Sequence, residues 1–213
     1  MEFQKRNRKM YVTKLTAVTK VKYKVYLDDE FAFVLYKGEL SRYGIQEGAD
    51  LSQTVVEQIK EEVLKKRAKL RAMHILERAD RTEAQLYAKL KQDLYPEDII
   101  ACAMQYVKSF GYIGDANYAK RFVESKQSSK SKREVAMLLQ QKGIASEHIE
   151  NALESAYEEC DEKETIRKLV EKKRFCPEEA TLAEKKKMFD YLLRKGFRYE
   201  DIRQVIQVSL ENA

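Results

Sequence analysis

The chain has 213 residues and a formal net charge of +6, and 36% of its side chains are charged. With two prolines and seven glycines it has the composition of a helix-rich protein, and an apolar fraction of 44% argues against disorder throughout. No apolar run approaches the roughly 18 residues of a membrane-spanning helix. No apolar segment follows the basic N-terminal residues, as it would in a signal peptide. We therefore expect a cytoplasmic protein.

The N-terminal part is predicted to form a small β-module. Residues 1–10 are a basic lead-in that can touch nucleic acid or serve only as a solubilising tail. Residues 10–35 then carry three runs rich in β-branched and aromatic side chains, and the second and third runs alternate with a period of two. Leu27–Glu30 has the composition of the turn that joins these two. We expect a hairpin or a three-stranded sheet that packs on the helices through one face.

Residues 52–79 are predicted to be mostly helical, because apolar residues recur there with helical spacing. Asp50 or Ser52 can cap the start of this segment. The pattern fits either one long helix or two. A basic cluster, Lys65–Arg67, lies within it, and both a solvated helix face and a phosphate contact are open for this cluster. On its own the cluster favours the solvated face.

Residues 110–149 have the pattern of a helical repeat, with a turn, a helix, a polar Ser/Lys link, a second helix and the start of a third. Asp115 is placed to cap the first of these helices. Ser131 and Glu134 have the spacing of a capping box for the second helix. Gly143 stands in the C′ position that ends it.

Parts of this pattern recur on both sides of the central repeat, which indicates tandem units that cannot bury their apolar faces alone. Thr82 and Gln85 repeat the capping-box spacing, and Gly196 repeats the glycine stop. Leu94 takes the place of the glycine in the first copy, so we expect that helix to end differently. The repeat length suits three short helices. The alternative is a coincidental similarity among amphipathic helices.

The predicted fold is mainly α, an elongated tandem array of three-helix repeats behind the small N-terminal β-module. We expect the β-module at residues 1–50, a linker helix and the first repeat at 51–112, the second repeat at 113–160 and the third at 161–213. An array of this kind presents an extended concave surface to a partner.

Charges are sorted along the chain. Residues 120–142 are strongly basic and residues 143–164 are strongly acidic, so we expect two faces of opposite potential. Part of the basic charge lies at helix C-termini, where cations offset the helix dipole without any partner. As a group, the basic residues of the second and third repeats are the candidate site for an acidic or polyanionic partner. They are Lys120, Arg121, Lys126, Lys130, Lys132, Arg133, Lys172, Lys173, Arg174, Arg194, Lys195 and Arg198.

The sequence contains no P-loop, no dinucleotide-binding fingerprint, no H-E-x-x-H motif and no plausible Ser/His/Asp grouping. Cys102, Cys160 and Cys176 are widely spaced and form no C-x-x-C pair, which argues against both a disulfide framework and a zinc site. His74 and His148 are too far apart in sequence to suggest a metal pair. We expect a monomeric protein with no enzymatic activity, no cofactor and no metal.

The pattern G-Y-x-x-D-x-x-Y-A-x-x-F-V over Gly111–Val123, followed by L-x-x-K-G-I over Leu139–Ile144, resembles the RecX family of bacterial recombinase regulators. The resemblance covers about residues 68–210, and the N-terminal part resembles the β-extension of longer members. Family members usually carry two acids where Gly114 and Asp115 stand, so only Asp115 matches here. The resemblance implies a cytoplasmic, non-enzymatic modulator of the RecA recombinase filament.

The hypothesis that this resemblance implies is a regulator in DNA repair, recombination and the SOS response. It would dock along the groove of the RecA filament, touch DNA phosphates and inhibit the recombinase, ATPase and co-protease activities. Two other classes stay open. One is a protein that binds single- or double-stranded DNA directly and acts by occupying it, and the other is a helical-repeat scaffold for a different protein. Aromatic residues are sparse among the basic clusters, so base stacking is not strongly indicated.

Overall fold

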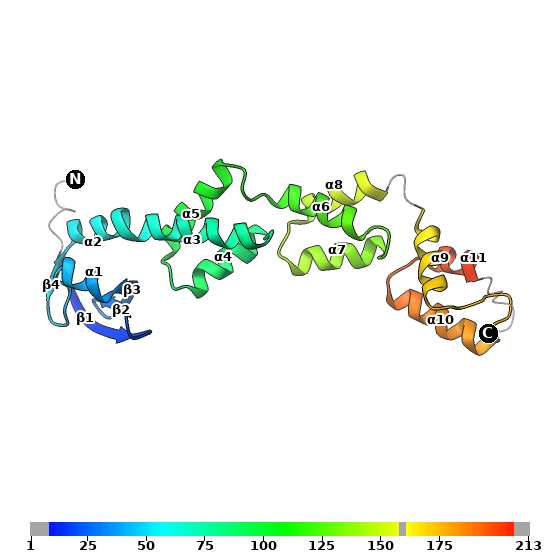
Figure 1. The fold of residues 1–213 in the computed structure, drawn as a ribbon, viewed down its shortest axis with the longest axis horizontal. Coiled ribbons are helices and arrows are strands. Elements are labelled where there is room, and N and C mark those ends of the chain that lie inside the picture. The colour runs from blue at the N-terminus through cyan, green and yellow to red at the C-terminus, as the bar shows by residue number, and fades with distance from the viewer. Residues whose placement is uncertain (1–8, 158–160, 207–213) are drawn as a thin grey trace. The chain divides into compact units, whose positions relative to one another are not determined.

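The computed structural model describes residues 9–157 and 161–206, and the chain divides into two compact units, Met1–Ile113 and Gly114–Ala213 (Figure 1). The first unit contains β1 (Lys9–Ala17), β2 (Lys22–Leu27), β3 (Glu30–Tyr36), α1 (Lys37–Arg42), β4 (Asp50–Ser52), α2 (Gln53–Ile59), α3 (Lys65–Arg78), α4 (Glu83–Gln92) and α5 (Glu97–Ser109). The second contains α6 (Asp115–Lys126), α7 (Lys132–Gln141), α8 (Ser146–Tyr157), α9 (Glu162–Lys172), α10 (Leu182–Arg194) and α11 (Tyr199–Ile206). The predicted mainly α fold, with three-helix repeats behind a small antiparallel sheet, is confirmed.

The N-terminal sheet has four antiparallel strands within the described part of the chain, in the order β3-β2-β1-β4. The sequence predicts three, and it misses β4 because a strand of three residues carries no period-two pattern. β4 pairs with the start of β1, where Met10 lies opposite Leu51. Asp28 and Asp29 connect β2 to β3 with φ angles of 50° and 67°. Two positive φ angles are the geometry of a type I′ hairpin turn, so the predicted turn is confirmed.

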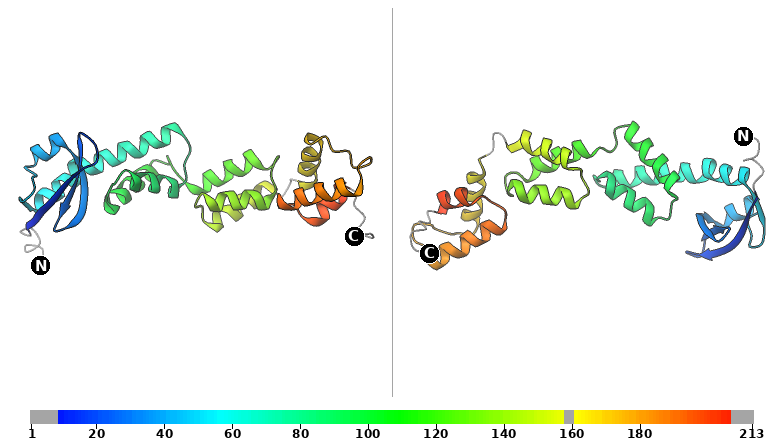
Figure 2. Two further views of the ribbon diagram at one scale, coloured as in Figure 1. Left: turned by 90° about the horizontal axis from the view of Figure 1, so that it is seen from below. Right: turned by 180° about the vertical axis from the view of Figure 1, so that it is seen from behind.

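The sheet is held by a core that it shares with the helices of the same unit. Figure 2 shows the backbone of these elements from two further sides. Phe33 and Leu35, which alternate along β3, are fully buried. Val56 and Ile59 of α2 belong to the same buried cluster. Leu40 joins this core from α1, a short helix that the sequence pattern does not predict.

The linker segment is one continuous helical run, which decides between the one helix and the two that the sequence leaves open. α2 leads into α3 through Lys60–Leu64, five residues with the wider hydrogen bonding of a π-helix. Ser52 rather than Asp50 caps the start of the run. Its hydroxyl accepts a 3.3 Å hydrogen bond from the backbone N–H of Val55.

The second helices of the first and third repeats begin at matching capping boxes. The hydroxyl of Thr82 accepts a bond from the backbone of Gln85, and the Gln85 side chain accepts one from the backbone of Thr82, as predicted. Thr181 and Glu184 form the same motif ahead of α10, and hydrogen bonds from Thr181 lower the pKa of the Glu184 carboxyl. The repeat register that aligns Gly143 with Gly196 does not align this third box. The reason is that α10 has 13 residues and α7 has 10.

Two helix ends differ from expectation. Gly114 occupies the N-cap position of α6, and Asp115 is the first helical residue, where its charge favours the positive end of the helix dipole. Leu94 has a φ of 65° after α4, in the same left-handed region as Gly143 at 81° and Gly196 at 86°. The first repeat therefore ends α4 as the others end their second helices, and the expected difference is wrong. Leucine adopts this conformation at a cost of roughly 1–2 kcal/mol.

Candidate interaction surface in the second and third repeats

The second and third repeats meet where the start of α7 faces the end of α10. Ser131, the N-cap residue of α7, is fully buried at this meeting point. Its hydroxyl accepts a 3.1 Å hydrogen bond from the backbone N–H of Glu134 and donates a 2.7 Å bond to the carbonyl of Lys195. A hydroxyl can do both because it has one proton and two lone pairs. The second bond satisfies a carbonyl at a helix C-terminus, where such groups lack partners within the helix.

Gly196 lets the two helix ends approach closely. A Cβ atom at this position would lie 2.9 Å from Oγ of Ser131 and 3.2 Å from Cβ of Arg133. The φ of 86° at Gly196 also disfavours any larger residue. The predicted glycine stop of α10 thus has a further role, because it makes room for the second repeat.

The reciprocal half of the predicted capping box at α7 is not formed. The carboxylate of Glu134 instead contacts Nζ of Lys130 and lies 3.5 Å from Nζ of Lys195. The Glu134 side chain is only 16% exposed, so solvent screens these ion pairs less than surface pairs. Lys195, a predicted site cation of the third repeat, therefore reaches across to the second repeat, while Lys130 pairs with Glu134 inside the second.

The first turn of α9 adds two more bonds across the junction. The hydroxyl of Thr165, which is buried, donates to the backbone carbonyl of Gln127 at 3.2 Å. The carboxylate of Glu162 accepts a bond of 2.8 Å from the backbone N–H of Lys132. Together with the Ser131 bond, these contacts fix the register between the backbones of the two repeats.

Four exposed cations surround this junction, and we call them the junction patch: Lys132, Arg133, Arg194 and Arg198. They lie at the start of α7, in the last turn of α10 and shortly after Gly196. Arg133 runs along Gly196, with its Cδ 3.4 Å from the place that a Cβ would take. None of the four is in an ion pair with a residue that the structure describes. Their charges remain available to a partner.

Three other predicted cations lie on α6: Lys120, Arg121 and Lys126. α8, which packs against α6, carries exposed carboxylates at Glu147, Glu150 and Glu154. The basic and acidic segments of the sequence thus fall on different helices of one repeat. Glu158 and Glu159, which belong to the acidic segment of the sequence, lie outside the described residues.

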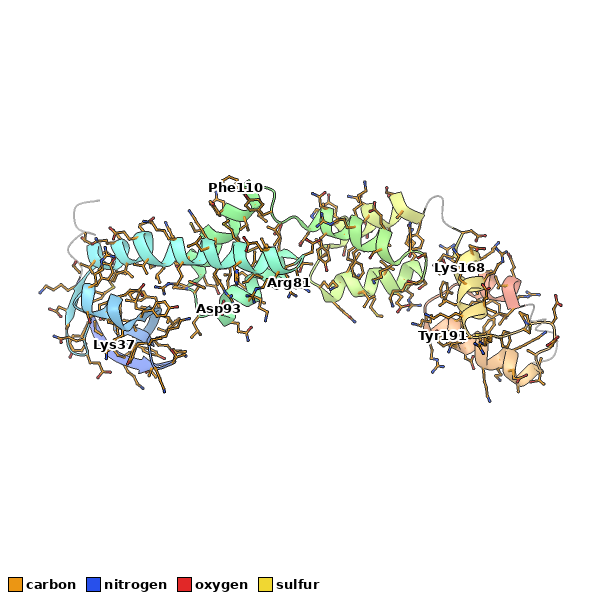
Figure 3. The ribbon with its side chains drawn as sticks, in the orientation of Figure 1. Lys37, Arg81, Asp93, Phe110, Lys168 and Tyr191 are labelled. Atoms are coloured by element: carbon orange, nitrogen blue, oxygen red, sulfur yellow. The ribbon has the colours of Figure 1, made fainter. Side chains whose placement is uncertain are left out.

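The last three predicted cations lie at the C-terminal end of α9. Because α9 contacts the second repeat near Thr165, Lys172 lies about 10 Å further along the helix axis. Nζ of Lys173 lies 4.6 Å from the ring centre of Tyr191 on α10. Tyr191 is labelled in Figure 3. Arg174 follows with a φ of 53°. Tyr191 lies one turn before Arg194 on α10, so Lys173 contacts the helix that carries part of the junction patch.

The residues at 9–157 and 161–206 include no group of three His, Cys, Asp or Glu side chains that could hold a metal ion. No helix within these ranges is both long and apolar enough to cross a membrane. Cys102 is half-buried and Cys176 is exposed, both as free thiols, while Cys160 and the basic residues 1–8 lie outside the described ranges. The junction patch offers ammonium and guanidinium donors, which recognise carboxylate and phosphate groups.

Comparison with known proteins identifies the family. Models of the RecX three-helix domains match three consecutive segments, the first domain at residues 68–106, the second at 115–153 and the third at 161–206. Regulatory protein RecX of Caldanaerobacter subterraneus subsp. tengcongensis is 35% identical over 189 residues, which cover 88% of this chain and 93% of that protein. Regulatory protein RecX of Leuconostoc citreum is 30% identical over 195 residues, which cover 90% of this chain and 73% of that protein.

Solved structures share the fold. A crystal structure of a regulatory protein RecX aligns with a TM-score of 0.57 at 24% identity, covering 93% of this chain and 98% of that one. RecX from Lactobacillus salivarius aligns with a TM-score of 0.54 at 24% identity, covering 68% of this chain and 95% of that one. The resemblance seen in the sequence is confirmed, and the chain belongs to the RecX family.

Proposed function

We propose that this chain binds the RecA recombinase filament on DNA and lowers its recombinase, ATPase and co-protease activities. The observation that carries the proposal is the junction patch, four exposed cations that two repeats hold in one place. The relatives are regulatory proteins by name. Accordingly, the proposed action is binding and not catalysis.

The junction patch suits a surface that presents acidic side chains, exposed phosphates or both. Clustered cations attract such a surface over several ångströms and align it. Because the bond from Ser131 to Lys195 ties together the backbones that carry the patch, less conformational freedom is lost on binding. Arginine adds two parallel hydrogen bonds to a carboxylate or a phosphate. The proposed place of contact is the groove of the filament. Protein and DNA backbone lie together there across neighbouring subunits.

The remaining predicted cations extend this surface. In this proposal residues 113–160 and 161–213 form the binding part, while 1–50 and 51–112 make separate contacts. The secondary cations are Lys120, Arg121, Lys126, Lys172, Lys173 and Arg174. They act together and weakly, since single exposed charges contribute little.

Direct binding to DNA is the second candidate, because the net charge of +6 favours any polyanion. Binding of that kind needs no recombinase. Its affinity falls with salt, with a log–log slope of roughly −0.7 to −0.9 for each neutralised phosphate. A scaffold for another protein would respond to neither DNA nor filament.

The test is the ATPase activity of RecA on single-stranded DNA while this protein is titrated in. Filament docking predicts a loss of activity at ratios far below those needed to coat the DNA. Direct DNA binding predicts a loss only once this protein covers the DNA, and the scaffold alternative predicts none. A binding assay with the same DNA in the absence of RecA fixes the coating ratio.

A further inference from the structure

A cavity lies in the first compact unit, where the β-module meets the first repeat. It has a volume of about 320 Å³ and is lined from β2, β3, α3 and the connection between α4 and α5. This volume is enough for several waters, since one water needs roughly 10–15 Å³ of such space. It falls at the small end of the range for ligand sites. The charged side chains of its wall are Lys22, Arg67, Arg71 and Asp93.

Three cations converge on this cavity from two elements. Lys22 of β2 and Arg67 of α3 approach the same ring, with Nζ and Cζ respectively 5.2 and 4.6 Å from the centre of Tyr36. Arg71 lies one turn after Arg67 on the same side of α3. Its Nε donates a 2.7 Å bond to the carboxylate of Asp93 (labelled in Figure 3). Cations this close together repel one another unless anions offset them.

Only part of this positive charge is neutralised within the protein. Arg67 pairs with Glu39, and Arg71 uses only its Nε on Asp93 among the described residues. Lys22 has no acidic partner in the described part of the chain. Two carboxylates therefore face three cations. The ammonium of Lys22 and the outer nitrogens of Arg71 are left as hydrogen-bond donors.

The connection between α4 and α5 completes the wall with Leu94 and Tyr95. Burial raises the pKa of the Tyr95 phenol to about 12, so its hydroxyl stays protonated and can donate a hydrogen bond. Leu94 has a φ of 65°, which is disfavoured for leucine. This conformation ends α4, as Gly143 and Gly196 end α7 and α10, and it leads the chain on to Tyr95 in the cavity wall.

We propose that this cavity binds the phosphate group of a small ligand, either inorganic phosphate or a nucleotide. The phosphate would accept hydrogen bonds from Lys22, Arg71 and Tyr95 and would offset the excess positive charge. Asp93 holds Arg71 in place and is also the internal anion with which the ligand competes. The β-module thereby gains a ligand site of its own. This proposal is independent of the filament proposal, because every residue of the cavity wall belongs to the other compact unit.

Isothermal titration calorimetry of the full chain with inorganic phosphate and, separately, with ATP tests the proposal. We expect saturable binding of at least one of them. Tighter binding of ATP identifies a nucleotide as the ligand, and equal or weaker binding identifies free phosphate. The variant Lys22→Met loses one charge-assisted hydrogen bond, so its affinity should fall about tenfold. Asp93→Asn keeps an acceptor for Arg71 and removes the competing charge, so its affinity should rise.

Lys20→Met is the matched control, because it removes one exposed lysine from the same hairpin outside the cavity. Its affinity should equal that of the parent protein. The proposal is wrong if neither probe binds saturably, or if the Lys20 and Lys22 variants weaken binding equally. It is also wrong if the Asp93 variant binds less tightly. Thermal unfolding of each variant establishes that the comparison is made between folded proteins.

Discussion

The hydroxyl of Ser131 donates a 2.7 Å hydrogen bond to the backbone carbonyl of Lys195, which joins the start of α7 to the end of α10. The same hydroxyl caps α7, so one buried oxygen serves two helices from different repeats. Both helix ends carry cations of the junction patch. The position of that patch therefore depends on a contact between backbones and not only on flexible side chains.

Replacing Ser131 by alanine removes both hydrogen bonds at once. We expect the variant Ser131→Ala to lose about 2 kcal/mol of stability, since the helix cap and a buried bond to a carbonyl are lost together. Ser129→Ala is a matched control, because that hydroxyl is exposed and its bond among the described residues is to the nearby carbonyl of Lys126. Its stability should change by less than about 0.5 kcal/mol. Urea unfolding measures both, and equal losses would contradict the role given to Ser131.

Gly196 should be far less tolerant of alanine than a glycine with the same backbone geometry in open space. Gly196→Ala combines an unfavourable φ of 86° with a Cβ that meets Ser131 and Arg133, so we expect a loss of about 2–3 kcal/mol. Gly111 has a φ of 68° with nothing within 4 Å, so Gly111→Ala should cost about 1 kcal/mol. The difference in urea midpoints between the two variants isolates the contact. If the two variants have the same urea midpoint, Gly196 does not contact Ser131 and Arg133 of the second repeat.

Tyr95 should make the protein less stable in strong alkali. In the folded chain burial raises the pKa of Tyr95 to about 12, whereas an unfolded tyrosine loses its proton near about pH 10. Between these values the folded state binds more protons than the unfolded state, so the free energy of unfolding falls as the pH rises. The parent protein should lose stability over this window more steeply than Tyr95→Phe. Unfolding curves at several pH values give the slope of the unfolding free energy against pH for each protein. The slope should be more negative for the parent protein than for Tyr95→Phe.

Local patterns are sufficient to predict much of the fold. A cap closes its hydrogen bonds within four residues, which is why Thr82 and Gln85 are recognisable in the sequence alone. Ser131 and Lys195 are 64 residues apart, and no local pattern leads from one to the other. At Leu94 the local sequence gives a wrong prediction. Its side chain suggests a different helix end, yet the surrounding structure enforces the left-handed conformation that glycine provides in the other repeats.

The cations of the candidate site can be found in the sequence, but which of them are exposed and unpaired cannot be predicted from it. Counting cations along the chain finds Lys130 and Lys132 equally well. Only the folded structure shows that Lys130 is bound to Glu134 while Lys132 is exposed and outside any ion pair that the structure describes. Glu162 looks like one more charge of an acidic segment, yet its carboxylate accepts a bond from the α7 backbone. These distinctions depend on contacts between repeats, which sequence periodicity does not encode.

The central claim is that the junction patch contacts the recombinase filament. The most direct measurement is inhibition of the RecA ATPase on single-stranded DNA by the triple variant Lys132→Gln/Arg133→Gln/Arg198→Gln. Its charge-matched control is Lys185→Gln/Lys186→Gln/Lys187→Gln, three lysines at the other end of α10. The account predicts that the first variant needs at least about tenfold more protein for half-maximal inhibition and the control less than about twofold more. Equal shifts, or none in either variant, would contradict it.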